Sequence, residues 1–433
     1  ICRLAIQGNN LQRTRCATLS AMPTDFAQLA NEVLRRCRQL ATYSEDPTCL
    51  TRTFLSPPMA EVHRALGEWM QTLGMSTRVD AMGNFVGRRE GASSKRTLLL
   101  GSHLDTVPNA GAFDGVLGVL VALAAVKTLE ETPLPFAVDV IGFSEEEGVR
   151  FAKPYLGSRA IAGSFDLALL TRQDARQISL QQALLDFGLD PAQIAAAAYH
   201  AEEVVGFLEA HLEQGPILES LGVPVGLVEG IVGQSRLRVR FVGAAGHAGT
   251  TPMEARRDAL VPAATWIQAI QRYAVECPGL RATVGSVHVV PNAPNVIAGE
   301  VELSLDVRHA ADETREQALA HLLASARQIA VTHRVEFQLI EQTSQGSTAV
   351  DERLKKSLAD SIEDCGHRLI ALPSGAGHDA VVMAEKFPMA MLFIRHPGGV
   401  SHHPDERVEA SDVAVAIEVV SKFISRVSRE FAE

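Results

Sequence analysis

Apolar residues recur at helical spacing in the first third of the chain. Residues 25–41 and 59–74 each place apolar side chains on one face of a helix, and Pro57 and Pro58 precede the second segment. The almost continuous apolar run 116–129 is typical of a buried helix. The pattern therefore predicts three helices in this region.

Two other apolar segments end abruptly in polar residues. The segment from Thr97 reads TLLLGSHLDTV, and the segment from Ala137 reads AVDVIGFSEEEG. A buried parallel strand is apolar along its length and delivers polar side chains to the carboxyl edge of its sheet, where ligands bind in α/β folds. These segments predict an α/β domain with a mostly parallel sheet flanked by helices, and chemistry at its carboxyl edge.

A different pattern follows His211. Leu237, Val239 and Phe241 alternate with polar residues, as in a strand with one exposed face. Further strands at 282–289 and 301–307 and a helix at 314–330 predict a smaller α+β domain inserted into the larger one, and the chain ends in a helix at 411–431. We expect a leader at residues 1–21 and a catalytic domain in two parts, at residues 22–221 and 337–433. The inserted domain is expected between these parts, at residues 222–336.

Composition excludes several classes of protein. The 433 residues carry a net charge of −11 without a basic stripe, which argues against binding to nucleic acid or to an anionic membrane. No apolar run reaches the roughly 18 residues of a membrane span. The six cysteines are scattered without a C-x-x-C pair, so we expect a reducing compartment, the cytoplasm. The basic, acid-poor leader is compatible with a transit peptide. We favour the alternative, that it is a cloning remnant or an upstream extension of the reading frame.

Candidate metal ligands lie at the predicted strand ends. Imidazole nitrogen and carboxylate oxygen suit Zn²⁺, Mn²⁺ or Co²⁺, and one carboxylate can bridge two ions. Taken singly, a histidine is more often a core or surface residue, and three adjacent glutamates usually form a solvated face. Asp105, two residues after His103, is placed to accept the second ring N–H of a metal-bound imidazole. The candidates are His103, Asp114, Glu146, Glu147, His211 and His402.

Several sequence blocks together resemble one family. They resemble the amidase branch of the aminoacylase and carboxypeptidase-type metallohydrolases, which contains allantoate amidohydrolases, N-carbamoyl-L-amino acid hydrolases and β-ureidopropionases. The similarity runs from about residue 25 to the C-terminus in family order. The blocks are GSHLDTV from Gly101, FDG from Phe113, FSEEEGVRF from Phe143, HLEQGPILE from His211, GHAGTTPM from Gly246, PNVI from Pro294, SGAGHDA from Ser374 and GGVSHHP from Gly398.

The resemblance implies a binuclear metal site. Asp114 would bridge two divalent ions, Mn²⁺ or Zn²⁺ with Co²⁺ or Ni²⁺ as alternatives, and Glu146 would act as general base. The register of base and ligand within 145–147 stays open by one residue. The ligands implied by the resemblance are His103, Asp114, Glu147, His211 and His402.

The resemblance also implies a substrate shell drawn partly from the inserted domain. His247 would stabilise the oxyanion, often from the second subunit of a homodimer. Arginine makes bidentate bonds to a carboxylate, which suits Arg308 as an anchor. We expect hinge closure near residues 220 and 336. The other implied substrate contacts are Gln214, Asn295, His378 and Gly399.

The expected substrate is a small ureido carboxylate. FSEEEGVRF, YLGSRAIAG and RHPGGVSHHPDE look most like allantoate amidohydrolases, which convert allantoate to ureidoglycine, carbon dioxide and ammonia in purine nitrogen salvage. An N-carbamoyl-L-amino acid hydrolase or β-ureidopropionase remains open. A dipeptidase or aminoacylase is disfavoured by the HLEQGP block, and a non-enzymatic binding module is disfavoured because no ligand or base is missing.

Overall fold

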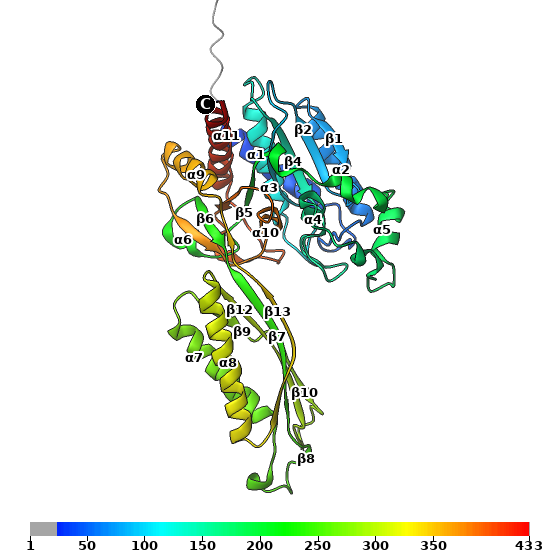
Figure 1. Cartoon of the computed structure of the whole chain (residues 1–433), viewed down its shortest axis with the longest axis vertical. Helices are drawn as coiled ribbons and strands as arrows, with labels where there is room; N and C mark the ends of the chain where they lie inside the picture. Colours follow the sequence, from blue (N-terminus) through cyan, green and yellow to red (C-terminus); the bar gives the residue numbers. More distant parts are fainter. Residues whose placement is uncertain (1–23, 433) are drawn as a thin grey trace, which may run out of the picture.

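The computed structural model describes residues 24–432 as two units (Figure 1). A larger unit is built on a nine-stranded sheet, and a smaller unit on a five-stranded sheet extends away from it (Figure 1). The predicted leader, residues 1–21, lies outside the described residues. Among residues 24–432, no helix combines the length and apolar composition that a membrane crossing needs.

The large sheet is mixed, with a parallel centre. Its order is β1-β2-β4-β3-β5-β16-β6-β14, with β15 beside β6. β4, β3, β5 and β16 run parallel, whereas β1, β2, β6 and β14 add antiparallel edges. The predicted mostly parallel arrangement therefore holds for the centre and for the β15–β6 pair, whereas the other edge pairs are antiparallel. The strands are β1 Ser76–Val79, β2 Phe85–Arg89, β3 Thr97–His103, β4 Ala137–Phe143, β5 Val204–Leu212, β6 Val225–Ile231, β14 Thr348–Ala349, β15 Ala371–Ser374 and β16 Met389–Ile394.

Helices cover both faces of this sheet, which explains why β3, β4 and β5 are buried at every position. α1, α3, α9 and α11 share one core with the sheet, and α4 and α10 pack against the other face. α2 begins two residues earlier than predicted, at Pro57, because proline suits the first turn of a helix. The helices are α1 Phe26–Ala41, α2 Pro57–Gln71, α3 Val116–Thr128, α4 Leu156–Ala162, α5 Leu180–Asp186, α6 Ile217–Leu221, α9 Glu352–Asp364, α10 Asp379–Met383 and α11 Ala410–Ala432.

The smaller unit, residues 233–345, is a sheet with helices on one face. Alternation along β7 buries Leu237, Val239 and Phe241 against α7 and α8, as predicted. The opposite face is polar, with Arg240 paired to Glu302 across the sheet. The elements are β7 Gly233–Val242, β8 Gly246–His247, α7 Leu260–Glu276, β9 Arg281–Thr283, β10 Val287–Val290, β11 Val296–Ile297, β12 Glu300–His309, α8 Asp312–Thr332 and β13 Glu336–Gln345.

The structure differs from the prediction at the boundaries of this unit. β6 belongs to the large sheet and β13 to the small one, so the chain crosses between the units near residues 232 and 346 rather than at 222 and 336. A single residue, Val232, separates β6 from β7, which leaves no break in the apolar pattern. The strand predicted at 282–289 is two short strands, β9 and β10, which both pair with β12.

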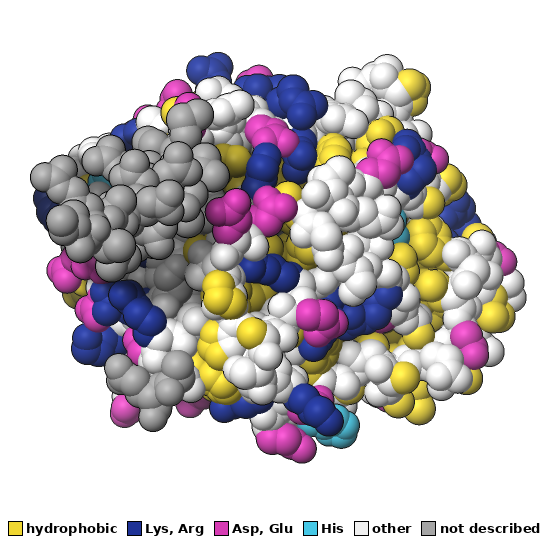
Figure 2. Space-filling model, turned by 90° about the horizontal axis from the view of Figure 1, so that it is seen from above, with side chains coloured by type: hydrophobic (Ala, Val, Ile, Leu, Met, Phe, Trp, Pro, Cys, Tyr) yellow, Lys and Arg dark blue, Asp and Glu magenta, His cyan; other side chains and the backbone are white. Residues whose placement is uncertain are grey.

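Neither positive nor negative side chains dominate the face of the molecule seen in Figure 2. Lysine and arginine side chains are interspersed there with aspartate and glutamate.

Candidate active site

The predicted ligands meet at the carboxyl ends of the central strands. His103 ends β3, His211 lies near the end of β5, and Asp114 precedes α3. The Nε2 atom of His211 lies 3.3 Å from Oδ1 of Asp114, and Nε2 of His402 lies 3.3 Å from Oδ2. Both oxygens of Asp114 therefore face an imidazole, one on each side.

The five residues form two ligand groups that share Asp114. His103, Asp114 and His211 offer ligand atoms within 4.8 Å of one another, and so do Asp114, Glu147 and His402. A carboxylate shared between two nitrogen- and oxygen-ligand groups is the arrangement that binds two divalent ions side by side. Two further groups, which overlap the first two, also offer ligand atoms within 4.8 Å of one another. One consists of His103, Glu146 and Glu147, and the other of Glu209, His211 and His378.

The electrostatics of the site fit bound cations. Burial, and then the charges of Glu147 and Asp379, raise the pKa of Glu146 well above its ordinary value. Burial raises the pKa of Glu147 to about 7, although His103 opposes this rise. Buried carboxylates crowded in this way repel one another unless protons or cations neutralise them. The donor set thus suits divalent ions.

Both imidazoles of the first group are oriented by backbone carbonyls. Nδ1 of His103 lies 2.9 Å from the carbonyl oxygen of Asp105, and Nδ1 of His211 lies 3.0 Å from that of Leu212. Each ring donates through Nδ1 and leaves Nε2 facing Asp114. Burial lowers the pKa of His211 to about 4, which keeps a lone pair on Nε2 available to a metal ion.

Asp105 acts differently from the prediction. Its carboxylate is 3.9 Å from the His103 ring, and it instead accepts hydrogen bonds from the backbone N–H groups of Glu146 at 3.0 Å and Glu147 at 3.1 Å. The expected carboxylate–histidine pair is therefore wrong, because the carbonyl of the same residue takes the ring N–H. Asp105 fixes the turn that carries the two glutamates.

The glutamates of this turn point in different directions. Glu145 has a φ of 51°, and its Oε1 accepts the backbone N–H groups of Arg150 and Phe151, away from the ligands. Glu146 and Glu147 both line the cavity at the site. This geometry matches the register in which Glu146 is the candidate base and Glu147 the candidate ligand.

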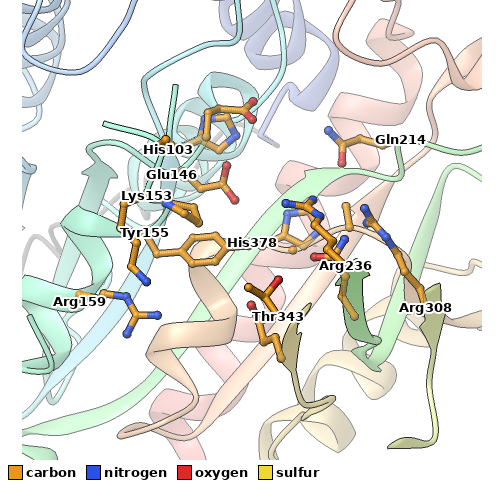
Figure 3. A pocket seen from close by; sticks show the side chains of 18 of the residues that line it. His103, Glu146, Lys153, Tyr155, Arg159, Gln214, Arg236, Arg308, Thr343 and His378 are labelled. Atoms are coloured by element: carbon orange, nitrogen blue, oxygen red, sulfur yellow. The ribbon is translucent and has the colours of Figure 1, made fainter. Parts of the chain in front are cut away.

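A cavity of about 690 Å³ opens beside the ligand groups, between the two units (Figure 3). Three predicted substrate contacts line it: Gln214, Arg308 and His378. Gln214 donates to Oδ1 of Asp114 at 3.1 Å, and Arg308 donates from Nη1 to the carbonyl of Gly375 at 2.7 Å. The smaller unit supplies the rest of one wall: Gln234, Arg236, Thr343, Ser344 and Gln345.

Three predicted contacts do not line this cavity. His247 is exposed on β8 beside β11, and Asn295 accepts from the backbone of Ala248 at 3.0 Å, so these two lie together. β8 lies at the end of the smaller unit farthest from the large sheet (Figure 1). Gly399 lies against Gly215 with a φ of 58°.

Comparisons with known proteins agree with this architecture. Residues 99–426 match the family model Peptidase family M20/M25/M40. The chain belongs to this family. A protein named probable allantoate deiminase from Oryza sativa is 36% identical, covering 92% of this chain and 88% of the relative. An N-carbamoyl-L-amino acid amidohydrolase from Geobacillus stearothermophilus is 38% identical, covering 83% and 90%. The crystal structure of a hydantoinase/carbamoylase family amidase from Burkholderia multivorans is 30% identical with a TM-score of 0.85, covering 92% and 98%.

The comparisons confirm the resemblance that the sequence blocks indicate. The relatives are named as amidohydrolases and deiminases, and this M20 family chain is a hydrolase that acts on amide bonds. The described ligand groups agree with a metal-dependent enzyme.

Other residues of this M20 site were missed by the sequence reasoning. Oε1 of Glu406 accepts the backbone N–H groups of Phe113 at 2.8 Å and Asp114 at 3.0 Å, which fixes the shared ligand. Its place in the HPDE block beside His402 was the available signal. Lys153, Tyr155, Arg159 and Arg236 line the cavity, and no spacing rule marks them.

Proposed function

We propose that this M20 family protein hydrolyses the ureido C–N bond of allantoate, giving ureidoglycine, carbon dioxide and ammonia in purine nitrogen salvage. Support comes from relatives named allantoate deiminase and allantoate amidohydrolase. The alternative, an N-carbamoyl-L-amino acid, is supported by relatives named for that reaction.

The lining of the cavity favours allantoate. No valine, leucine, isoleucine, methionine, phenylalanine or tryptophan of residues 24–432 lines the cavity. Its apolar lining is limited to Ala152, Pro154, Ala376 and the ring of Tyr155, so an apolar amino-acid side chain would gain less there than in a pocket lined by large aliphatic residues. Allantoate carries a carboxylate and two ureido groups, so every arm of it can form hydrogen bonds with this wall. This single observation carries the choice of substrate.

The site would hold two divalent ions, Mn²⁺ or Zn²⁺, with Co²⁺ or Ni²⁺ as alternatives, on His103, Asp114, Glu147, His211 and His402. When bound, such ions supply Lewis acidity, which a ureido carbonyl needs because two nitrogens donate electrons into it. Asp114 would be the shared ligand, held in place by Glu406.

The chain's own groups supply the proton transfers. Glu146 lies in the cavity on a turn held by Asp105, and its raised pKa suits a group that both accepts and returns a proton. Glu146 takes a proton from the attacking water and delivers it to the departing nitrogen. Arg308 and Gln214 orient the substrate, with the guanidinium of Arg308 toward the carboxylate.

A second copy of the chain would complete the site. His247 and Asn295 lie together at the far end of the smaller unit, so their proposed contact with substrate requires a neighbouring subunit. The smaller unit would serve as lid and dimerisation module, closing about hinges near residues 232 and 346.

The cytoplasm stays the predicted location, because the four described cysteines are free thiols.

The test is ammonia release by Mn²⁺-loaded protein from allantoate and, side by side, from N-carbamoyl-L-amino acids with apolar and polar side chains. We expect allantoate to have the highest kcat/KM. Preference for an N-carbamoyl-L-amino acid with an apolar side chain would contradict the choice of substrate and keep the chemistry. Failure to turn over any of them would contradict the proposed function.

A further inference from the structure

One wall of the cavity has no assigned role. Lys153, Tyr155 and Arg159 form this wall, and Figure 3 shows them on the side opposite to Arg236 and Arg308. Tyr155 and Arg159 belong to the YLGSRAIAG block, and Lys153 lies two residues before it, on the segment that follows the turn of the glutamates.

This wall is fixed relative to Glu146. α4, which carries Arg159, is joined to the glutamate turn because the backbone N–H of Gly157 donates to the carbonyl of Ser144 at 2.9 Å. The side chain of Asn84 donates to the carbonyl of Gly157 at 3.0 Å. A Cβ on residue 157 would lie 2.2 Å from Oδ1 of Asn84, so the approach needs glycine. The backbone of the helix that carries Arg159 is therefore fixed relative to the glutamate turn, and Arg159 lies beyond Lys153 and Tyr155 as seen from Glu146 (Figure 3).

Arg159 differs from the structural arginines around it. Arg52 donates to the carbonyls of Leu40 and Leu104, and Arg150 pairs with Asp174. Among residues 24–432, no carboxylate lies within 4.0 Å of Arg159, and its Nε is buried without a hydrogen-bond partner. The Nε atoms of Arg36 and Arg315 are likewise buried without a partner, but each of these arginines pairs with a carboxylate through another nitrogen, whereas Arg159 has no such ion pair among the described residues. Arg159 lines the substrate cavity instead.

The basic residues on the two walls of the cavity also differ in whether a carboxylate neutralises them. On the smaller unit, Arg236 and Arg308 share the carboxylate of Asp306, at 3.1 and 2.7 Å. On the opposite wall, Lys153 and Arg159 have no such partner among the described residues. This wall is therefore suited to an oxygen acceptor on the substrate.

We propose that Arg159 is a specificity-determining residue that donates to the terminal oxygen of the substrate arm that does not react. In allantoate, this atom is the carbonyl oxygen of the second ureido group. The inference rests on the proposed function: with the reacting ureido group at Glu146 and the carboxylate at Arg308, the third arm of the central carbon points to the remaining wall. Arg159 thus selects a polar third arm over an apolar one.

The experiment compares two substrates in one variant. Allantoate and N-carbamoyl-L-norvaline differ in the third arm, which is a ureido group in the first and a propyl group in the second. For Arg159→Met we expect kcat/KM for allantoate to fall about 10- to 100-fold, because a hydrogen bond from a charged group to the substrate is lost. The value for N-carbamoyl-L-norvaline should stay within about twofold, since a propyl arm accepts no hydrogen bond.

The matched control is Arg35→Met, on the exposed face of α1. It should leave both substrates unchanged. If Arg159→Met folds poorly, as judged by its thermal melting, Arg159→Gln and Arg159→Lys take its place. Both keep an N–H donor, and Arg159→Lys should recover part of the allantoate activity.

Four outcomes would overturn the assignment. Equal losses for both substrates would show a structural role for Arg159, and no loss for either would show no role. Both results leave the proposed function standing, since the unmodified protein still turns over allantoate. Wild-type turnover of N-carbamoyl-L-norvaline in preference to allantoate would contradict the assignment and the substrate but keep the hydrolytic chemistry. If the wild type hydrolyses neither substrate, the proposed function itself is contradicted, and the assignment of Arg159 with it.

Discussion

Replacing Asp105 by asparagine tests how the catalytic turn is held. The carboxylate is 1% exposed and accepts one backbone N–H on each oxygen, from Glu146 at 3.0 Å and from Glu147 at 3.1 Å. An asparagine side chain offers one oxygen and turns its NH₂ group toward the other N–H. One charge-assisted hydrogen bond is lost and one buried donor is left without a partner.

The expected cost follows from these two contacts. A hydrogen bond to a charged group contributes about 1.5–3 kcal/mol and a buried unpaired donor costs about 1–3 kcal/mol. Because the two effects overlap, we expect Asp105→Asn to lower the free energy of unfolding by about 2–4 kcal/mol. A shift of about 1 Å in Glu146 or Glu147 should also lower kcat about 100-fold.

The assay combines urea unfolding of the Mn²⁺-loaded protein with ammonia release from allantoate. The control is Asp25→Asn at the start of α1, where the side chain caps Gln28 and asparagine caps equally well. We expect the control to change the free energy of unfolding by less than about 0.5 kcal/mol. Unchanged stability together with unchanged kcat in Asp105→Asn would refute the role of this carboxylate.

Three further predictions concern anchoring, packing and metal. Arg308→Ala should raise KM at least about tenfold with little change in kcat, measured by steady-state ammonia release; an unchanged KM would remove Arg308 from the substrate site. Gly157→Ala places a Cβ 2.5 Å from the carbonyl oxygen of Ser144 and should destabilise by about 2 kcal/mol or more in urea unfolding, whereas Gly285→Ala, with its nearest neighbour at 3.5 Å, should not. Chelation should lower Tm in scanning calorimetry, because ions at 100 times their Kd stabilise the native state by about 2.7 kcal/mol; a Tm insensitive to the chelator would argue against resident ions.

Much of the fold could be predicted because local patterns agree with the tertiary structure. The apolar runs that become β3 and β4 end in polar residues, and those ends meet at one edge of the sheet. His103 and the three glutamates therefore lie at the strand ends where the apolar runs predicted them. The boundaries of the smaller unit were not, because β6 and β7 follow one another with only Val232 between them.

Details of the site depend on contacts that spacing does not encode. The left-handed backbone at Glu145 turns its side chain away from those of Glu146 and Glu147. Three identical adjacent residues give no sign in the sequence of which one adopts this conformation. Asp105 uses its carbonyl for His103 and its carboxylate for the turn, although the sequence allowed the reverse. Arg159 reads as an ordinary polar position on a short helix until the cavity around it is known.

The most direct test of the central claim, two-metal hydrolysis with Glu146 as base, is a comparison of wild type and Glu146→Gln. Metal content per chain and ammonia release from allantoate are measured on the same Mn²⁺-loaded samples. We predict about two ions per chain in both proteins and a loss of about 100-fold or more in kcat for the variant. Turnover within a few-fold of wild type at full metal content, or fewer than one ion per chain in active wild-type protein, would contradict it.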